Sequence, residues 1–164
     1  MIEAHELPPM SMTNAHAKIV VQGPTTLSAA KTRPTNSTLE PFWNEKFVFG
    51  VEEDHKDSTF ICAELFSMLD EHDAVKMGAI RPIPVTTLLS GQKMSLPTII
   101  QGNHIYCIDG WFDLTTEVSA TVQPFVIGLS RTKVPGKCQV HLRITFIPSP
   151  GTAQLSILGF RSQY

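Results

Sequence analysis

The chain has 164 residues, a length that suits one domain of ordinary size. Its composition, with 42% hydrophobic and 17% charged residues, is that of a globular chain and argues against disorder. The formal net charge of −2 lacks the basic excess of a nucleic-acid-binding protein, and it argues against attraction to an anionic membrane by bulk charge alone.

Short runs rich in β-branched and aromatic residues predict strands, and twelve prolines and ten glycines separate them. Phe47 and Phe49 share one face of an early strand, and Val140, Leu142, Ile144 and Phe146 share one face of a late one. About eight strands of this kind predict an antiparallel sandwich or barrel. In chain order the expected strands are residues 17–21, 29–33, 46–51, 59–66, 78–85, 111–114, 124–129 and 138–147.

Three of these segments carry further expectations. The continuous apolar run of residues 59–66 predicts a strand buried between two layers. Pro82 and Pro84 confine residues 78–85 to a sheet edge or a bulge, because proline cannot donate to a ladder. The charged residues 52–57 predict a solvated loop.

The remaining signals concern compartment and chemistry. Cys62, Cys107 and Cys138 have no CxxC pairing, which favours a reducing compartment. Cys62 and Cys138 lie in apolar runs, where we expect cysteine to behave as a small buried hydrophobe. The sequence lacks a signal-peptide pattern at Met1 and lacks a run of about 20 apolar residues, which predicts a soluble, cytoplasmic chain. The motifs of nucleophilic and metallohydrolase sites are also missing, and we expect no enzyme activity.

Segments in the order of a known family appear along residues 1–148. Trp43 and Asn44 lie in the most specific of them, where a proline turn precedes a tryptophan able to anchor two layers. The third segment follows Lys31-Thr32, and a W-x-x-L pattern at 111–114 precedes the fourth. The four segments are residues 2–8 (IEAHELP), 14–20 (NAHAKIV), 38–49 (TLEPFWNEKFVF) and 136–144 (GKCQVHLRI).

In this order the segments resemble the C2 domain family, which implies an eight-stranded antiparallel β-sandwich over residues 1–148. The resemblance also implies where calcium ligands would lie in relatives that bind the ion. Calcium takes six to eight oxygen ligands, several of them charged. In this sequence none of the residues at the ligand-type positions is acidic. They are Ser11, Asn14, Ser67, Leu69, His72 and Val75.

We therefore expect no cofactor and calcium-independent binding. Asp70, Glu71 and Asp73 lie in the third loop but outside the family's register, so a weak, rearranged calcium site stays open as an alternative. A solvated acidic loop is the preferred interpretation of these three carboxylates.

The same loops suggest two surfaces for a partner. One is an apolar patch at the loop tips, for shallow membrane insertion or a protein groove; a small internal cluster is the equal alternative. Its residues are Met10, Met12, Phe42, Met68 and Leu69. The other is a basic lipid-headgroup face, for which scattered solvated charges are the alternative. Its candidates are Lys18, Lys31, Arg33 and Lys46.

The two ends of the chain fit the family pattern less well. The first strand, at residue 2, begins about half a strand late, and residues 149–164 continue past the last expected strand with alternation at 154–160. Three accounts are open: an additional edge strand beside the first strand, the start of a further domain, or a strand exchanged in a homodimer.

The function expected from these features is a calcium-independent C2 binding module of a larger trafficking, signalling or scaffold protein. Its partner is a phospholipid at a membrane periphery, or a protein. A scaffold domain without lipid binding and a weakly calcium-dependent phospholipid-binding domain are the alternatives. We expect no nucleic-acid partner.

Overall fold

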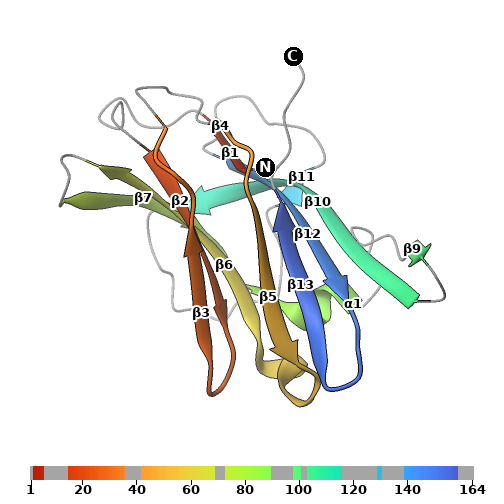
Figure 1. Ribbon diagram of the computed structural model, residues 1–164. Coiled ribbons are helices and arrows are strands. Elements are labelled where there is room, and N and C mark those ends of the chain that lie inside the picture. The colour runs from red at the N-terminus through yellow and green to blue at the C-terminus, as the bar shows by residue number, and fades with distance from the viewer. Residues whose placement is uncertain are drawn as a thin grey trace.

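A computed structural model describes residues 2–5, 15–35, 42–68, 73–89, 98–100, 103–115, 129–130 and 139–158. Nearly every element is a strand (Figure 1). The elements are β1 (Ile2–His5), β2 (Ala15–Gln22), β3 (Leu27–Lys31), β4 (Phe42–Trp43), β5 (Lys46–Glu52), the 3₁₀ helix η2 (Glu53–Ser58), β6 (Phe60–Met68), β7 (Ala74–Ile80), β8 (Ile83–Pro84), α1 (Val85–Leu89), β9 (Thr98–Ile100), β10 (Asn103–Thr115), β11 (Leu129–Ser130), β12 (Gln139–Ile147) and β13 (Thr152–Leu158).

The strands form two antiparallel layers. One layer has the order β3-β2-β6-β7, and the other contains β10 and β12 with β1, β4, β5 and β13 beyond them. The layers are joined at one corner, where Leu114 and Thr115 of β10 pair with Ile80 and Ala79 of β7. This arrangement confirms the predicted antiparallel sandwich.

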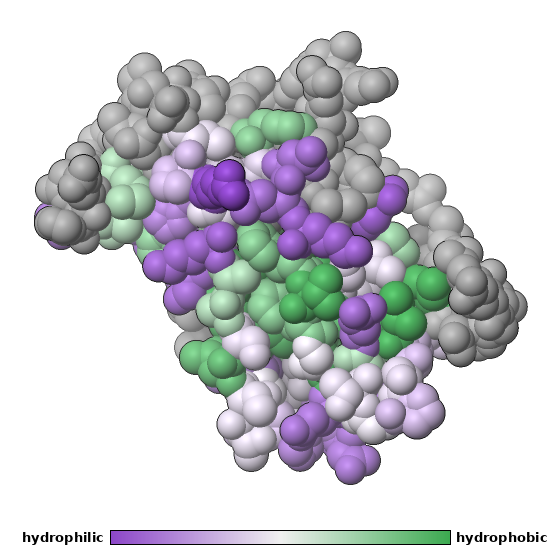
Figure 2. Space-filling view, in the orientation of Figure 1, coloured by the Kyte–Doolittle hydropathy of each residue, from purple (hydrophilic) through white to green (hydrophobic). Residues whose placement is uncertain are grey.

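Alternating side chains build the core between the layers. Val140, Leu142, Ile144 and Phe146 of β12 are all buried, as their spacing predicts. These residues form one core cluster with the buried residues of β2 and β6, which lie in the other layer. The buried residues of β13, which lies beside β12 in the same layer, belong to the same cluster. Figure 2 shows hydrophobic side chains across the middle of one face, over β5 and the strands beside it, with hydrophilic side chains above and below.

Three sequence-based expectations are wrong in detail. Residues 59–66 are not buried on both sides, because β6 lies in a two-layer sandwich and its outer face, with Phe60, meets solvent. Residues 78–85 do not form one strand: β7 ends at Ile80, β8 follows, and α1 starts at Val85. Residues 52–57 form mostly the 3₁₀ helix η2 instead of the expected loop, although none of the residues of η2 is buried. Of the strand expected at 124–129, only residue 129 is described, in β11.

The strand β12 has two partners in succession along one of its edges. Its first half pairs with β1, where Glu3 lies opposite His141, and its second half pairs with β13, where Leu158 lies opposite Arg143. On their far sides β1 pairs with β4, and β13 pairs with β5. Because both are antiparallel to β12, β13 and β1 run in the same direction, end to end.

We call this arrangement the composite strand, consisting of β13 (Thr152–Leu158) followed in space by β1 (Ile2–His5). In space β13 occupies the part of the β12 edge that lies next to the start of β1. The sequence-based boundary at residue 148 separates β12 from β13, yet the two pair in one sheet, and β13 lies between two strands rather than at an edge.

Candidate binding surfaces

Residues that flank three connections of the chain lie together at one end of the sandwich. Ala15, at the start of β2, pairs with Ser67 near the end of β6 and forms a bridge with Thr35. Ser67 in turn lies opposite Val75 of β7. The connections 6–14, 36–41 and 69–73 therefore start or finish beside these residues, and this end is where the C2 resemblance places calcium ligands.

Two of the expected calcium-ligand positions, Ser67 and Val75, lie in the described part of the chain. Ser67 is buried within β6, and Val75 is exposed but has no side-chain oxygen. Asp73 is exposed just before β7. In the described part of the chain, no group of three or more His, Cys, Asp or Glu side chains is placed to hold a metal ion. Ser11, Asn14, Leu69, Asp70, Glu71 and His72 lie outside the described residues.

Two of the expected apolar tip residues are described. Phe42 is exposed on β4, whereas Met68 is half-buried at the end of β6 in the other layer. Met10, Met12 and Leu69 lie outside the described residues. The apolar tip patch therefore stays a prediction.

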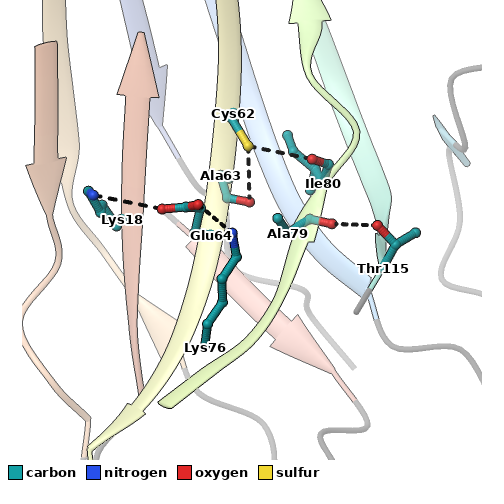
Figure 3. Close-up of polar contacts among 8 residues, drawn as sticks. All are labelled: Lys18, Cys62, Ala63, Glu64, Lys76, Ala79, Ile80 and Thr115. Atoms are coloured by element: carbon teal, nitrogen blue, oxygen red, sulfur yellow. Dashed lines mark hydrogen bonds and ion pairs between the residues drawn. The ribbon is translucent and has the colours of Figure 1, made fainter. Parts of the chain in front are cut away.

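A basic face forms on the outer side of β3, β2, β6 and β7. Lys18 and Lys31 lie directly opposite each other on β2 and β3, so their side chains leave the sheet on the same side. Glu64 of β6 lies opposite Lys18 and pairs with it at 3.8 Å. The other carboxylate oxygen of Glu64 is 2.5 Å from Nζ of Lys76, on β7. Figure 3 shows Glu64 between Lys18 and Lys76.

The other two expected basic residues lie elsewhere. Lys46 is exposed on β5, in the other layer, opposite Leu158. Arg33 follows β3, and its backbone N–H donates to Oε1 of Glu45 at 2.8 Å. The structure thus brings Lys18 and Lys31 together with Lys76, which sequence reasoning missed. Alternation along the sequence could not have identified Lys76, because β7 changes from exposed to buried along its length and the register shifts between Leu65 and Phe66.

His16 extends the basic face toward the loop end. Its ring stacks on that of Phe66, with centroids 5.3 Å apart and planes 10° from parallel. Burial and the nearby charge of Lys31 both lower the pKa of His16. The imidazole is therefore favoured in its neutral form, and the positive charge of this face comes from the lysines.

The opposite half of the same outer face is apolar. Leu27 of β3 is 70% exposed and Phe60 of β6 is 40% exposed, and both lie opposite Gln22 of β2. Val20 and Cys62 form the next cross-strand pair toward the lysines. One sheet face therefore combines an apolar half with a cationic half.

The described cysteines do not resemble reactive thiols. Burial, with a smaller contribution from Glu64, raises the pKa of Cys62 to about 11. Burial also raises the pKa of Cys107. A thiol with a raised pKa is a poor nucleophile because little of it is ionised near neutral pH.

A second polar cluster lies on the outer side of β10 and β12. Asp109 accepts hydrogen bonds from Nε2 of His141 at 2.9 Å and from Nη2 of Arg143 at 2.8 Å. The His141 ring also contacts Trp111, with centroids 5.1 Å apart. Burial alone would raise the pKa of Asp109, but the hydrogen bonds and charges of His141 and Arg143 outweigh it and lower that pKa.

This cluster predicts a pH dependence of stability. Because the pKa of Asp109 is lower in the folded than in the unfolded chain, its contribution is present above about pH 4 and is lost as the pH falls through the folded-state value. We expect Asp109→Asn to destabilise the protein more at about pH 7 than at about pH 3, measured by urea unfolding. Asp54→Asn, in η2, is the control. An equal loss at both pH values would contradict this role.

Comparison with known families assigns the fold. The model of the C2 domain matches residues 1–96, which is more than half of the chain. The chain belongs to the C2 domain family. This confirms the resemblance found in the sequence, and C2 domains are in general modules that bind membranes or proteins. No curated protein matches the chain. Within the described part of this C2 domain, no helix has the length and apolar composition needed to cross a bilayer.

Proposed function

We propose that this C2 domain is a calcium-independent binding module that docks on anionic phospholipid through the basic face of β2, β3, β6 and β7. The observation that carries the proposal is the grouping of Lys18, Lys31 and Lys76 on one sheet face. Lys18 and Lys76 both pair with one carboxylate, Glu64, and Lys31 lies opposite Lys18, so this face is locally cationic although the whole chain has a formal net charge of −2. Phosphate headgroups fit such a face.

The local charge is what supports docking in a defined orientation. A cation near an anionic membrane contributes about 1 kcal/mol, so two or three lysines give modest affinity that falls with salt. Calcium independence is supported by two of the ligand-type positions: Val75 has no side-chain oxygen, and Ser67 is buried.

Vesicle co-sedimentation tests this proposal with matched charge variants. We expect binding to phosphatidylserine-containing vesicles to be equal with calcium and with chelator, and to be weaker for pure phosphatidylcholine. Lys18→Gln and Lys31→Gln are each expected to lower the affinity roughly fivefold. Glu64→Gln removes the carboxylate between the lysines and is expected to raise it.

Lys46→Gln is the control for these variants, because Lys46 lies on the other layer and carries the same charge. An equal loss for Lys46→Gln would show that net charge, rather than the basic face, governs binding. Binding that needs calcium would contradict calcium independence.

A protein surface is the second candidate partner. It is favoured by the exposure of Leu27 and Phe60 beside the lysines, because exposed apolar side chains grouped on one face mark interaction sites. Absence of binding to any vesicle, together with retained folding, would make this scaffold function the better account.

A further inference from the structure

The composite strand is built from two segments that lie far apart in the sequence. Its first part, β13, follows β12 and is joined to it by residues 148–151. Its ladder with β12 runs from Gln154 to Leu158, and its ladder with β5 runs from Thr152 to Leu158. Extending residues 148–151 would therefore carry the whole of β13 away from both neighbouring strands.

The site that β13 occupies is specific for its sequence. Ala153, Leu155 and Ile157 are fully buried in the core, whereas Gln154 and Ser156 lie on the other side of the strand, where Gln154 is exposed and Ser156 is 8% exposed. Without β13, the backbone groups of both β5 and β12 would lose their partners, and a buried apolar slot would open. A strand with the same alternation and length is needed to fill it, and a second copy of this chain carries one.

The connection itself favours opening. Pro148 and Pro150 fix their own φ angles, and each restricts the residue before it to extended conformations. Residues 147–150 are thus biased toward an extended path, and the reversal includes Gly151, whose φ is +83°. A short hinge that is stiff and must still reverse the chain promotes exchange of the element beyond it.

We propose that two copies of this C2 domain exchange β13, so that β13 of each copy completes the composite strand of the other. The exchanged dimer keeps both ladders and the buried side chains of the closed monomer, and it replaces two chain reversals by two extended hinges. It is an assembly state of the chain that is independent of lipid binding.

Two hinge variants are expected to act in opposite directions. Gly151→Ala disfavours the left-handed φ of the closed hinge, and an added Cβ meets no atom within 4 Å, so the cost is conformational rather than a clash. It is expected to shift the balance toward dimer by roughly tenfold per hinge. Pro148→Gly with Pro150→Gly removes the extended bias and is expected to shift it toward monomer. Gel filtration with light scattering, over a series of protein concentrations, measures both.

A disulfide test identifies which strand is exchanged. Val48 of β5 lies directly opposite Ser156 of β13, at a spacing that a disulfide can bridge. Val48→Cys and Ser156→Cys are prepared as separate proteins, mixed, and refolded together from urea. Exchange places one new cysteine of each protein side by side, and a covalent dimer is expected on a non-reducing gel.

Three controls make the result decisive. The double variant in one chain must form an internal disulfide, which checks the geometry. Ser156→Cys mixed with Thr26→Cys, a residue in the turn between β2 and β3, reports random cross-linking and is expected to give none. If the Val48→Cys and Ser156→Cys mixture gives no more covalent dimer than this control, the proposal is wrong. It is equally wrong if both hinge variants leave the dimer fraction unchanged.

Discussion

Replacing Leu155 by alanine is expected to lower the free energy of unfolding by about 2–5 kcal/mol. Leu155 is 0% exposed at the centre of β13, between Phe146 of β12 and Phe49 of β5. Alanine removes buried methyl groups and leaves a cavity that two flanking strands keep open. Urea unfolding followed by the fluorescence of Trp43 and Trp111 measures the change.

Gln154→Ala is the matched control for this prediction, since Gln154 is the preceding residue of the same strand and faces outward. We expect that change to alter stability by less than about 0.5 kcal/mol. If both variants had small, equal effects, β13 would not belong to the core of the sandwich. The pair therefore separates a structural strand from an appended extension.

The faces of the strands could be predicted from the sequence, because side chains alternate along a strand with a period of two. That period correctly assigns Val140, Leu142, Ile144 and Phe146 to the core. It also explains the error at residues 59–66. An apolar outer residue such as Phe60 gives the run a continuous appearance although β6 has a solvent face.

The composite strand could not be predicted in the same way. Alternation indicates that residues 154–160 form a strand, but it carries no information about which strands are its neighbours. The late start of the first strand and the extra strand at the other end are both visible in the sequence. Only the register of Leu158 opposite Arg143 and Glu3 opposite His141 shows that they are two halves of one feature.

The basic face was predictable in part. Lys18 and Lys31 follow from the alternation of two strands joined by a short hairpin. The positions of Lys76 and Glu64 on this face depend on how β6 pairs with β7. The register of that pairing shifts after Leu65, so counting residues along the sequence does not predict which residues lie opposite each other. Lys46 was expected on the basic face but lies in the other layer, on β5. The sequence around a lysine on a strand gives no indication of which layer that strand joins.

Replacing Trp43 by alanine is expected to lower the free energy of unfolding by about 3–5 kcal/mol. Trp43 is 2% exposed in β4 and lies opposite Ile2, so it is buried beside the second half of the composite strand. Phe42→Ala is the matched control, because Phe42 precedes it in the same strand but is 39% exposed. A loss of stability as large for Phe42→Ala would contradict the assigned faces.

Trp43 and Leu155 test whether the composite strand behaves as one cooperative unit. Leu155 lies within the first half, β13, and Trp43 lies opposite the second half, β1, and the chain supplies these halves from segments far apart in sequence. If the halves belong to one core, each alanine variant should still unfold in a single transition, with fluorescence and circular dichroism midpoints that coincide. If the fluorescence and circular dichroism midpoints of Leu155→Ala differed, and the fluorescence showed Trp43 still buried after the first transition, β13 would unfold independently of the rest. The sandwich would then hold together without the strand that we propose it exchanges.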